Sequence, residues 1–249
     1  MNTIEILREV SHREYPVPTG PWVMSQLWLE LLFAHWPMKP DALRSLIPPA
    51  FHIDTFEREA WVGVVPFHMQ NVHPRGLPSV PGLSRFPELN VRTYVTINGK
   101  PGVYFFSLDA GNPIAVAIAR SVFHLPYFNA KMSSERKGDS IHYTSHRTHH
   151  HAPSADYTAR YRAIAPVEYT QQKTLAHWLT ERYSLYTTFR NHLYRGEIHH
   201  QQWPLQSAEL EVEQDTMALS HGIHLPDSPP LLHYSQRQEV LIWPLHRIQ

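Results

Sequence analysis

The sequence contains no cysteine among its 249 residues. This absence excludes disulfide bridges, zinc–thiolate sites and cysteine nucleophiles, and it fits a reducing compartment. There is also no excess of charge of either sign, because 22 Lys plus Arg stand against 22 Asp plus Glu. Proteins that bind nucleic acids carry a basic excess, since they replace the counterions of the phosphates. The composition therefore argues against a nucleic-acid partner.

Long hydrophobic runs are missing as well. The longest apolar stretch, residues 27–36, is interrupted by Glu30 and His35 and is too short to span a bilayer. The first sixteen residues mix charges with apolar side chains and show neither the apolar region nor the cleavage site of a signal peptide. We therefore expect a cytoplasmic protein that does not enter a membrane.

Proline is abundant, with 22 residues against 10 glycines, and 42% of the chain is hydrophobic. Prolines interrupt regular structure at short intervals, which favours many short strands over long helices. No internal repeat or long linker divides the chain, so residues 1–249 are predicted to form a single domain. The predicted fold class is α+β, mainly antiparallel, with a barrel-like core.

The predicted elements follow from periodicity and turn residues. Strands are predicted at residues 24–36, 51–56, 60–69, 88–97, 103–110, 141–148, 157–163, 184–189, 198–203 and 208–212, with a final pair within 231–243. Short helices are predicted at residues 39–46, 114–122 and 171–182, and a loop at 73–87.

The segment ELNVRTYVTI, residues 88–97, alternates with a period of two. One face carries Glu88, Asn90, Arg92, Tyr94 and Thr96, and the other carries Leu89, Val91, Thr93, Val95 and Ile97. Asn98-Gly99 predicts a tight hairpin, and the answering strand, residues 103–110, is apolar on both faces. The polar face is either a solvated surface or the wall of a pocket. The apolar partner favours a pocket, because its own two faces need cover.

In a pocket wall, Glu88 and Arg92 lie on one face and are expected to pair. A buried ion pair is costly to desolvate, so a polar or acidic ligand explains it better than stability does. Arginine holds a carboxylate through two parallel hydrogen bonds. Glu88 is the candidate general acid or base, with Asn90 and Arg92 as ligand-binding residues and Tyr94 as a further ligand-binding residue or proton donor.

Two further arginines stand in apolar surroundings. Arg120 and Tyr127 flank the core-like run SVFHL, and Arg147 shares a face with Tyr143. Each arginine is either a surface residue whose stem covers apolar atoms or an anchor for an anionic ligand. Arg120 and Arg147 are thus candidate ligand-binding residues, and Tyr127 is a second candidate proton donor.

The 19 histidines include His146 and the triplet at residues 149–151. Their spacing does not match a helical ligand pair such as HExxH, and adjacent histidines are commonly exposed. No metal site is predicted there. His35 lies in an apolar segment and is interpreted as a core residue with scope for acid–base work. The sequence has no GxSxG, Walker or GxGxxG motif, and no cofactor is predicted.

Seven blocks carry a resemblance to a known family. They are HWPM (35–38), WVGVVPF (61–67), ELNVRTYV (88–95), PGVYFFSLDA (101–110), ARSVFHLPY (119–127), LTERYSLY (179–186) and WPL (203–205). In this order they resemble the YqjF-like family of uncharacterised bacterial proteins, itself similar to a distant branch of the acetoacetate decarboxylase-like superfamily. The resemblance implies a cone-shaped antiparallel barrel around an apolar pocket, with a few helices outside.

The decarboxylases of that superfamily form a Schiff base through a lysine in a Pro-Lys-Lys motif. The corresponding place here is Pro126 followed by Tyr127 and Phe128, which cannot form an imine, and the nearest lysine is Lys131. Glu88 is similar in position to an acidic pocket residue of those enzymes. The resemblance thus implies that this protein has the pocket of the decarboxylases but lacks their Schiff-base lysine.

The combined interpretation is a barrel protein that binds a small organic molecule, with carboxylates as one ligand class. Two alternatives stay open. One is a lyase-like enzyme that uses Glu88 as acid or base, and the other is a non-catalytic sensor or a structural protein that forms a homo-oligomer.

The missing lysine gives the first prediction. Borohydride treatment in the presence of an oxo acid reduces any imine to a stable adduct, which mass spectrometry detects. We expect no adduct on this chain. A covalent adduct on Lys131 would contradict this expectation and restore imine chemistry.

Overall fold

The thirteen strands of the described chain form one continuous sheet that closes on itself. The computed structural model describes residues 3–248. Its elements are α1 (Thr3–Arg8), β1 (Met24–Met38), α2 (Pro40–Arg44), β2 (His52–Ile53), β3 (Ala60–Pro74), β4 (Phe86–Ile97), β5 (Lys100–Ala110), α3 (Pro113–Val122), β6 (Tyr127–Lys137), β7 (Ser140–Arg147), β8 (Asp156–Ala163), α4 (Leu175–Thr180), β9 (Ser184–Phe189), β10 (His192–His199), β11 (Gln206–Asp215), the 3₁₀-helix η1 (Leu219–His221), β12 (Leu231–Ile242) and β13 (His246–Arg247).

The main closure is a nine-strand barrel. Its order is β5-β6-β7-β8-β11-β12-β1-β3-β4, and β4 returns to β5 through an antiparallel ladder that starts at the Asn98-Gly99 turn. Both turn residues have positive φ, 50° and 75°, as a two-residue hairpin requires. The predicted fold class, mainly antiparallel with a barrel core and short helices, is confirmed.

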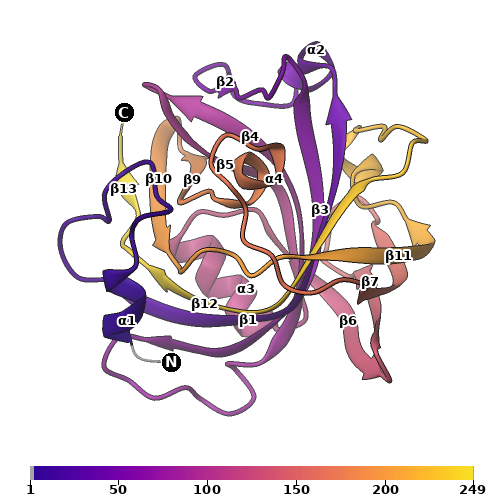
Figure 1. Ribbon diagram of the computed structural model, residues 1–249, viewed down its shortest axis with the longest axis horizontal. Helices are drawn as coiled ribbons and strands as arrows, with labels where there is room; N and C mark the ends of the chain where they lie inside the picture. Colours follow the sequence, from indigo (N-terminus) through magenta and orange to yellow (C-terminus); the bar gives the residue numbers. More distant parts are fainter. Residues whose placement is uncertain (1–2, 249) are drawn as a thin grey trace.

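A second, smaller circuit shares part of this wall (Figure 1). β5 is paired at two places on the same side: its end pairs with β6 and its beginning with β9, both in parallel. β12 likewise pairs with β11 at one end and with β10 at the other. The circuit β5-β9-β10-β12-β1-β3-β4 therefore closes as well. In Figure 1, α3 is seen through this circuit, which frames the candidate site described below.

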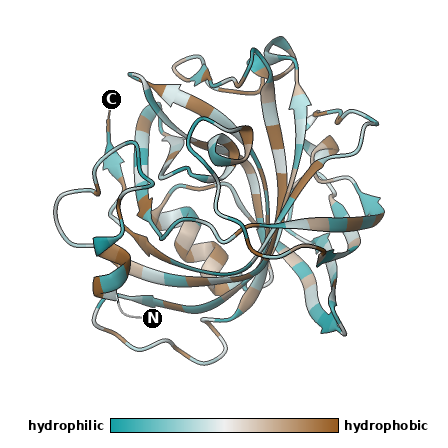
Figure 2. Cartoon of the chain, viewed as in Figure 1, coloured by the Kyte–Doolittle hydropathy of each residue, from teal (hydrophilic) through white to brown (hydrophobic). Residues whose placement is uncertain are grey.

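Aromatic side chains fill the interior of the nine-strand barrel. Tyr143, Tyr157 and Tyr161 are at most 1% exposed and pack with Tyr234 in the largest buried cluster. Hydrophobic residues recur along β3 in Figure 2, in keeping with a strand whose sides are both covered. The large barrel is thus a packed core and not a channel.

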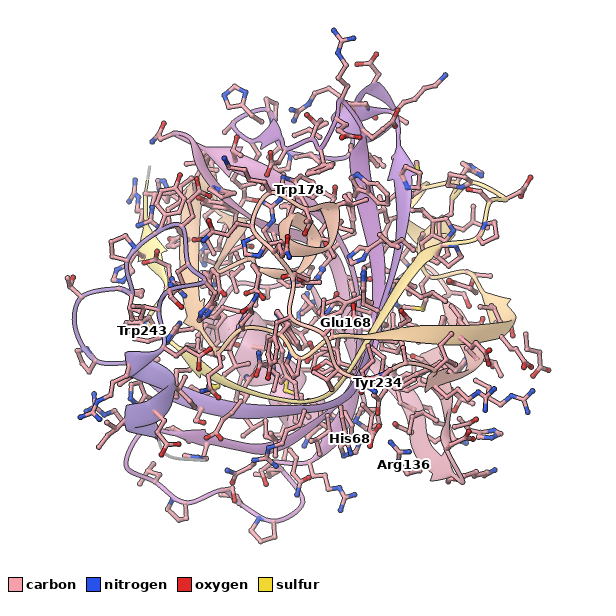
Figure 3. The ribbon with its side chains drawn as sticks, in the orientation of Figure 1. His68, Arg136, Glu168, Trp178, Tyr234 and Trp243 are labelled. Atoms are coloured by element: carbon pink, nitrogen blue, oxygen red, sulfur yellow. The ribbon has the colours of Figure 1, made fainter. Side chains whose placement is uncertain are left out.

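One edge of the barrel is held by a polar cluster around Glu30. Arg136 of β6 donates to the Glu30 carboxylate at 2.6 Å and to the Tyr234 hydroxyl at 3.1 Å, and Tyr234 also bonds to Glu30. Figure 3 shows Arg136 and Tyr234 near one another at the lower right of the molecule. The cluster links β6, β1 and β12, which lie far apart in sequence.

β4 separates the two compartments. Its odd-numbered residues Leu89, Val91 and Val95 are fully buried in the large-barrel cluster. Its even-numbered residues face the other way, and Glu88, Asn90 and Arg92 are 2%, 5% and 9% exposed. The prediction that the polar face is covered is therefore confirmed. No described helix is long and apolar enough to cross a membrane.

Several predicted boundaries were wrong. Of the strand predicted at 198–203, only residues 198–199 lie in a strand, as the end of β10, and the pair predicted within 231–243 is the single strand β12. The predicted strand at 51–56 shrinks to β2, and the helix at 171–182 shrinks to α4. Strand β6 was missed because its sequence, YFNAKMSSERK, lacks an apolar period and its outer part is exposed. The helix α1 was also missed.

Candidate ligand-binding site

A cavity of about 350 Å³ lies inside the smaller circuit and beneath α3. β1, β3, β4, β5 and α3 provide most of its wall, β9 contributes two residues, and β10 and β12 contribute one each. Most lining side chains are apolar, among them Leu31, Phe67, Phe105 and Leu108. Such a volume and lining are typical of sites for small organic molecules.

The polar face of β4 supplies the charged part of this wall. Glu88, Asn90 and Arg92 all line the cavity, because alternation along a strand sends every second side chain to the same side. Opposite Val91 and Arg92, the register with β5 shifts by one residue, so that β5 bulges beside Arg92. The sequence pattern thus predicted that these three residues share one wall, although Tyr94 and Thr96, which it placed on the same face, do not line the cavity.

Glu88 is held by Tyr127. The Tyr127 hydroxyl donates to Oε2 of Glu88 at 2.9 Å, and β6 brings it there because Tyr127 pairs with Leu108 at the end of β5. Burial raises the pKa of Glu88 to about 8, and the nearby Asp109 adds to this, whereas the Tyr127 hydrogen bond opposes it. Burial also raises the pKa of Tyr127 well above its usual value. At neutral pH both side chains carry a proton.

Arg92 has no acidic partner among residues 3–248. Its Nη2 donates to the Tyr94 hydroxyl at 3.4 Å, and its guanidinium lies 5.1 Å from the Phe33 ring centre. None of the ion pairs within the described residues includes Arg92. The predicted pair with Glu88 is wrong, because four positions along a strand separate the backbones by about 13 Å. A buried cation thus borders the cavity without a counter-charge.

Polar atoms without a partner gather around the cavity. Five buried atoms of its lining residues have no hydrogen-bond partner within the described part of the chain: Asn90 Oδ1, Arg92 Nε, Arg182 Nη2, Ser184 Oγ and Trp203 Nε1. Buried polar groups in folded proteins are nearly always satisfied. Such a concentration around one cavity indicates a place where a ligand supplies the missing partners.

Three of these five residues were not among the sequence candidates. Arg182 and Trp203 end the predicted elements 171–182 and 198–203, and Ser184 begins the predicted strand 184–189, but these patterns indicated no ligand role. The two shared blocks LTERYSLY and WPL were the only signal of one. Arg182 differs from Arg92 in having a partner, because its Nη1 donates to Asp54 at 2.7 Å. It also stacks on Trp178, with 4.1 Å to the ring centre.

Tyr94 does not line the cavity and lies behind Arg92. Its hydroxyl donates to the Leu179 carbonyl at 2.8 Å and lies 2.7 Å from Nε2 of His35. Burial lowers the pKa of His35 well below its usual value, so His35 is neutral. Because the Tyr94 proton goes to Leu179, we assign the His35 proton to Nε2, where it donates to Tyr94. The structure places Tyr94 and His35 as supports for Arg92.

Arg120 lies on the exposed side of α3 and is not part of the cavity lining. Its Nη1 donates to the backbone carbonyl of Tyr127 at 2.7 Å. The structure therefore shows Arg120 as a contact that holds the start of β6, where Tyr127 is placed, and does not bring it to the ligand space.

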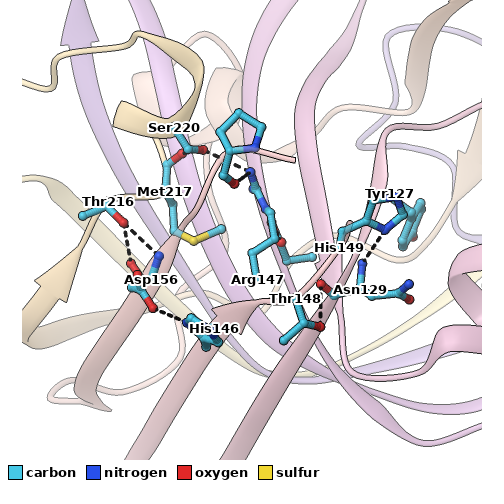
Figure 4. A network of polar contacts seen from close by, with 12 residues as sticks. Tyr127, Asn129, His146, Arg147, Thr148, His149, Asp156, Thr216, Met217 and Ser220 are labelled. Carbon is cyan, nitrogen blue, oxygen red and sulfur yellow. Dashed lines mark hydrogen bonds and ion pairs between the residues drawn. The ribbon is translucent and has the colours of Figure 1, made fainter. Parts of the chain in front are cut away.

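Arg147 does not line the cavity. It shares the buried face of β7 with Tyr143, which packs in the large-barrel cluster, and Figure 4 shows it extending toward Ser220. It forms two hydrogen bonds of 2.7 Å with the Asp109 carboxylate and lies 4.4 Å from the Phe128 ring centre. Its Nη1 also donates to the Pro153 carbonyl and to Ser220, both at 3.2 Å. The structure separates Arg147 from Arg92, because β7 and β4 turn these side chains into different compartments.

Two histidines of residues 146–151 contact neighbouring residues, His146 at the end of β7 and His149 in the loop after it (Figure 4). Nδ1 of His146 lies 2.6 Å from the Asp156 carboxylate, and Nδ1 of His149 accepts from the Asn129 amide at 3.1 Å. Across residues 3–248, no group of three or more His, Asp or Glu side chains is arranged to hold a metal ion.

Lysine takes no part in the cavity wall. All five lysines of the sequence lie in the described region, and none of them borders the cavity. Lys131 is exposed on β6. The position next to Glu88 is taken by the Tyr127 hydroxyl.

Solved structures define the class of protein to which this barrel belongs. Over 95% of this chain and 93% of the other, it is similar to the enduracididine biosynthesis enzyme MppR complexed with pyruvate, with a TM-score of 0.64 and 13% identity. Acetoacetate decarboxylase from Legionella pneumophila gives a TM-score of 0.62 and 14% identity over 100% of this chain and 98% of the other. The fold is thus that of the acetoacetate decarboxylase-like barrels.

Sequence comparison identifies the family more closely. Residues 25–239 match the family model DUF2071, described as an uncharacterized conserved protein. The chain is also 51% identical over 231 residues to the uncharacterized protein YqjF of Bacillus subtilis (strain 168), covering 93% of this chain and 95% of YqjF. The protein belongs to the DUF2071 family, which confirms the resemblance seen in the seven sequence blocks.

The buried carboxyl of Glu88 predicts a specific pH dependence of stability. Its pKa is about 8 in the folded protein against an ordinary 4.5. Between these values the folded state keeps a proton that the unfolded state has lost, so stability falls as the pH rises, by up to about 1.4 kcal/mol per pH unit. Glu88→Gln removes this contribution. The stability difference between Glu88→Gln and wild type should therefore grow from pH 5 to pH 8 in urea unfolding.

Glu213→Gln serves as the control, because Glu213 is exposed on β11 and the substitution changes the same atoms. The free energy of unfolding of Glu213→Gln should differ little from that of wild type, and the difference should not change between pH 5 and pH 8. A flat difference for Glu88→Gln as well would show that Glu88 is ionised in the folded protein.

Proposed function

We propose that the cavity binds a small organic carboxylate, with Arg92 as the residue that holds its anionic group. One observation carries the proposal: the Arg92 guanidinium is buried at the cavity wall, and no acidic side chain in the described chain pairs with it. An unpaired buried charge is unfavourable in a folded protein unless something compensates it. A ligand carboxylate supplies both the opposite charge and the two acceptor oxygens that a guanidinium fits.

The remaining unpaired groups suit the same ligand. Asn90 adjoins Arg92 on the polar face of β4, and Arg182 and Trp203 line other parts of the same cavity with donors that lack partners. Glu88 does not compete for Arg92, because its raised pKa keeps it uncharged at neutral pH. The wall thus offers a net positive charge to an anionic ligand, within an otherwise apolar space that strengthens electrostatic attraction.

Glu88 and Tyr127 give the proposed site an acid–base function. A carboxyl with a pKa of about 8 exchanges its proton readily near neutral pH, which is the property that general acid–base catalysis needs. Tyr127 engages Oε2, which leaves Oε1 as the oxygen that carries the mobile proton. Oxo acids are the proposed substrate class, because the similar MppR structure is described as a complex with pyruvate. Without a lysine in the wall, the chemistry proposed is direct proton transfer.

Binding of the carboxylate is tested with Arg92→Met, which keeps an unbranched side chain and removes the charge. We expect this variant to unfold at a higher temperature than wild type without ligand, because an uncompensated charge is lost; each kcal/mol corresponds to about 2–4 °C. Its affinity for pyruvate, measured by calorimetry, should fall by about tenfold or more. Arg182→Met is the comparison variant for stability alone, since this arginine lines the same cavity but pairs with Asp54.

Arg182→Met should lower the melting temperature, because it leaves the Asp54 carboxylate without its partner. Opposite shifts for the two variants would support the proposal. If Arg92→Met instead destabilises the protein and binds pyruvate as wild type does, Arg92 is a structural residue and the proposal fails.

The acid–base role is tested by the exchange of the pyruvate methyl protons in deuterium oxide, followed by proton NMR. We expect the protein to accelerate the exchange, with a rate that rises as the pH approaches 8, because the carboxylate form of Glu88 is the base. Glu88→Gln should reduce the acceleration by about a hundredfold or more. A protein that binds pyruvate without any exchange would instead be a non-catalytic binding or sensing protein.

A further inference from the structure

The cavity wall changes character from its interior to its opening. The lining residues that are exposed to solvent are Pro74, Pro78, Val80, Leu83, Ile114 and Ile118, all of them apolar. The ionisable lining residues Glu88, Arg92 and Arg182 are each less than 10% exposed. The cavity is therefore charged inside and apolar at its rim. A site that attracts a hydrated ion from solvent would instead have its charged groups at the opening.

The rim is formed by α3 and by the segment that joins β3 to β4. On α3, Ile114, Ile118 and Val122 follow at intervals of four and are 52%, 50% and 57% exposed. Val80 and Leu83 of the facing segment are 52% and 38% exposed. A contiguous exposed apolar surface marks a place where something apolar binds. Because Ile114 and Ile118 also line the cavity, this surface continues the cavity wall outward.

We infer that the ligand is an amphipathic carboxylic acid, whose anionic head lies at Arg92 and whose hydrocarbon or aryl tail extends along the apolar wall to the rim at Ile118 and Val80. The inference rests on the proposed function and adds the class of tail. The tail would pass Phe105 and Leu108, which line the cavity between the polar face of β4 and α3.

The volume of the cavity supports a ligand larger than pyruvate. At about 350 Å³, it falls at the lower end of the range of roughly 300–1,000 Å³ that holds drug-sized ligands. A head group alone would satisfy Arg92 but would leave the apolar wall and rim uncovered. A ligand tail would cover the side of Ile118 that faces the cavity. A second copy of the protein bound to the outer surface would not reach that side.

The tail is tested with propionate, hexanoate, octanoate and decanoate, each titrated into the full-length protein by calorimetry beside the primary alcohol of equal length. We expect each added methylene to tighten binding by about fourfold until the tail passes the rim. We also expect each acid to bind more tightly than its alcohol, because the alcohol cannot pair with Arg92.

Ile118→Gln locates the tail, and Ile164→Gln is the matched control. Both isoleucines are 50% exposed, and Ile164 does not line the cavity. Ile118→Gln should weaken decanoate by about fivefold or more and leave propionate unchanged, whereas Ile164→Gln should change neither. Light scattering of the wild type and of Ile118→Gln should give the same molar mass.

The apolar tail and the carboxylate site would be overturned by different results. If the acids bind more tightly than the alcohols but their affinity does not depend on chain length, the proposed tail is wrong and the carboxylate site is still supported. Alcohols and acids that bind equally, with affinity rising along the series, would overturn the carboxylate site and keep the apolar channel. A lower molar mass for Ile118→Gln than for wild type would show that a second copy covers the rim, and the tail would be rejected.

Discussion

β4 is buried on both of its faces, one against the aromatic interior of the nine-strand barrel and the other against the cavity. Leu89 and Val91 are fixed by the packed core, which tolerates little movement. Because neighbouring residues on a strand alternate, fixing the odd side chains also fixes Glu88, Asn90 and Arg92 at the cavity wall. The polar wall is thus held by the hydrophobic core behind it.

The two circuits exist because β5 and β12 each exchange partners along their length. β5 leaves β9 and continues with β6, and the β6 end places the Tyr127 hydroxyl on Glu88. The same change of partner separates the compartments, so that Asp109 and Arg147 satisfy each other in the packed barrel, while Arg92 faces the cavity without an acid. The electrostatic character of the site follows from this division.

Glu88 is an acidic residue and Arg92 a basic one, but the two side chains do not form an ion pair. Burial keeps the Glu88 carboxyl protonated, which leaves the cation of Arg92 as the net charge of the wall. An ion pair between them would have left the cavity wall without a net charge. In the function proposed above, their separation along the strand leaves Glu88 for proton transfer and Arg92 for binding of the carboxylate.

The sequence by itself determined the barrel class, the hairpin at Asn98-Gly99 and the shared face of Glu88, Asn90 and Arg92, because alternation and turn chemistry are local. The resemblance to the decarboxylases also led to the prediction that Tyr127 takes the place of their lysine. Only the tertiary structure decided that Arg147 and Arg120 lie outside the cavity and that Arg182 and Trp203 line it. These placements depend on which strands pair and which compartment each face enters, and such long-range pairing leaves no period in the local sequence.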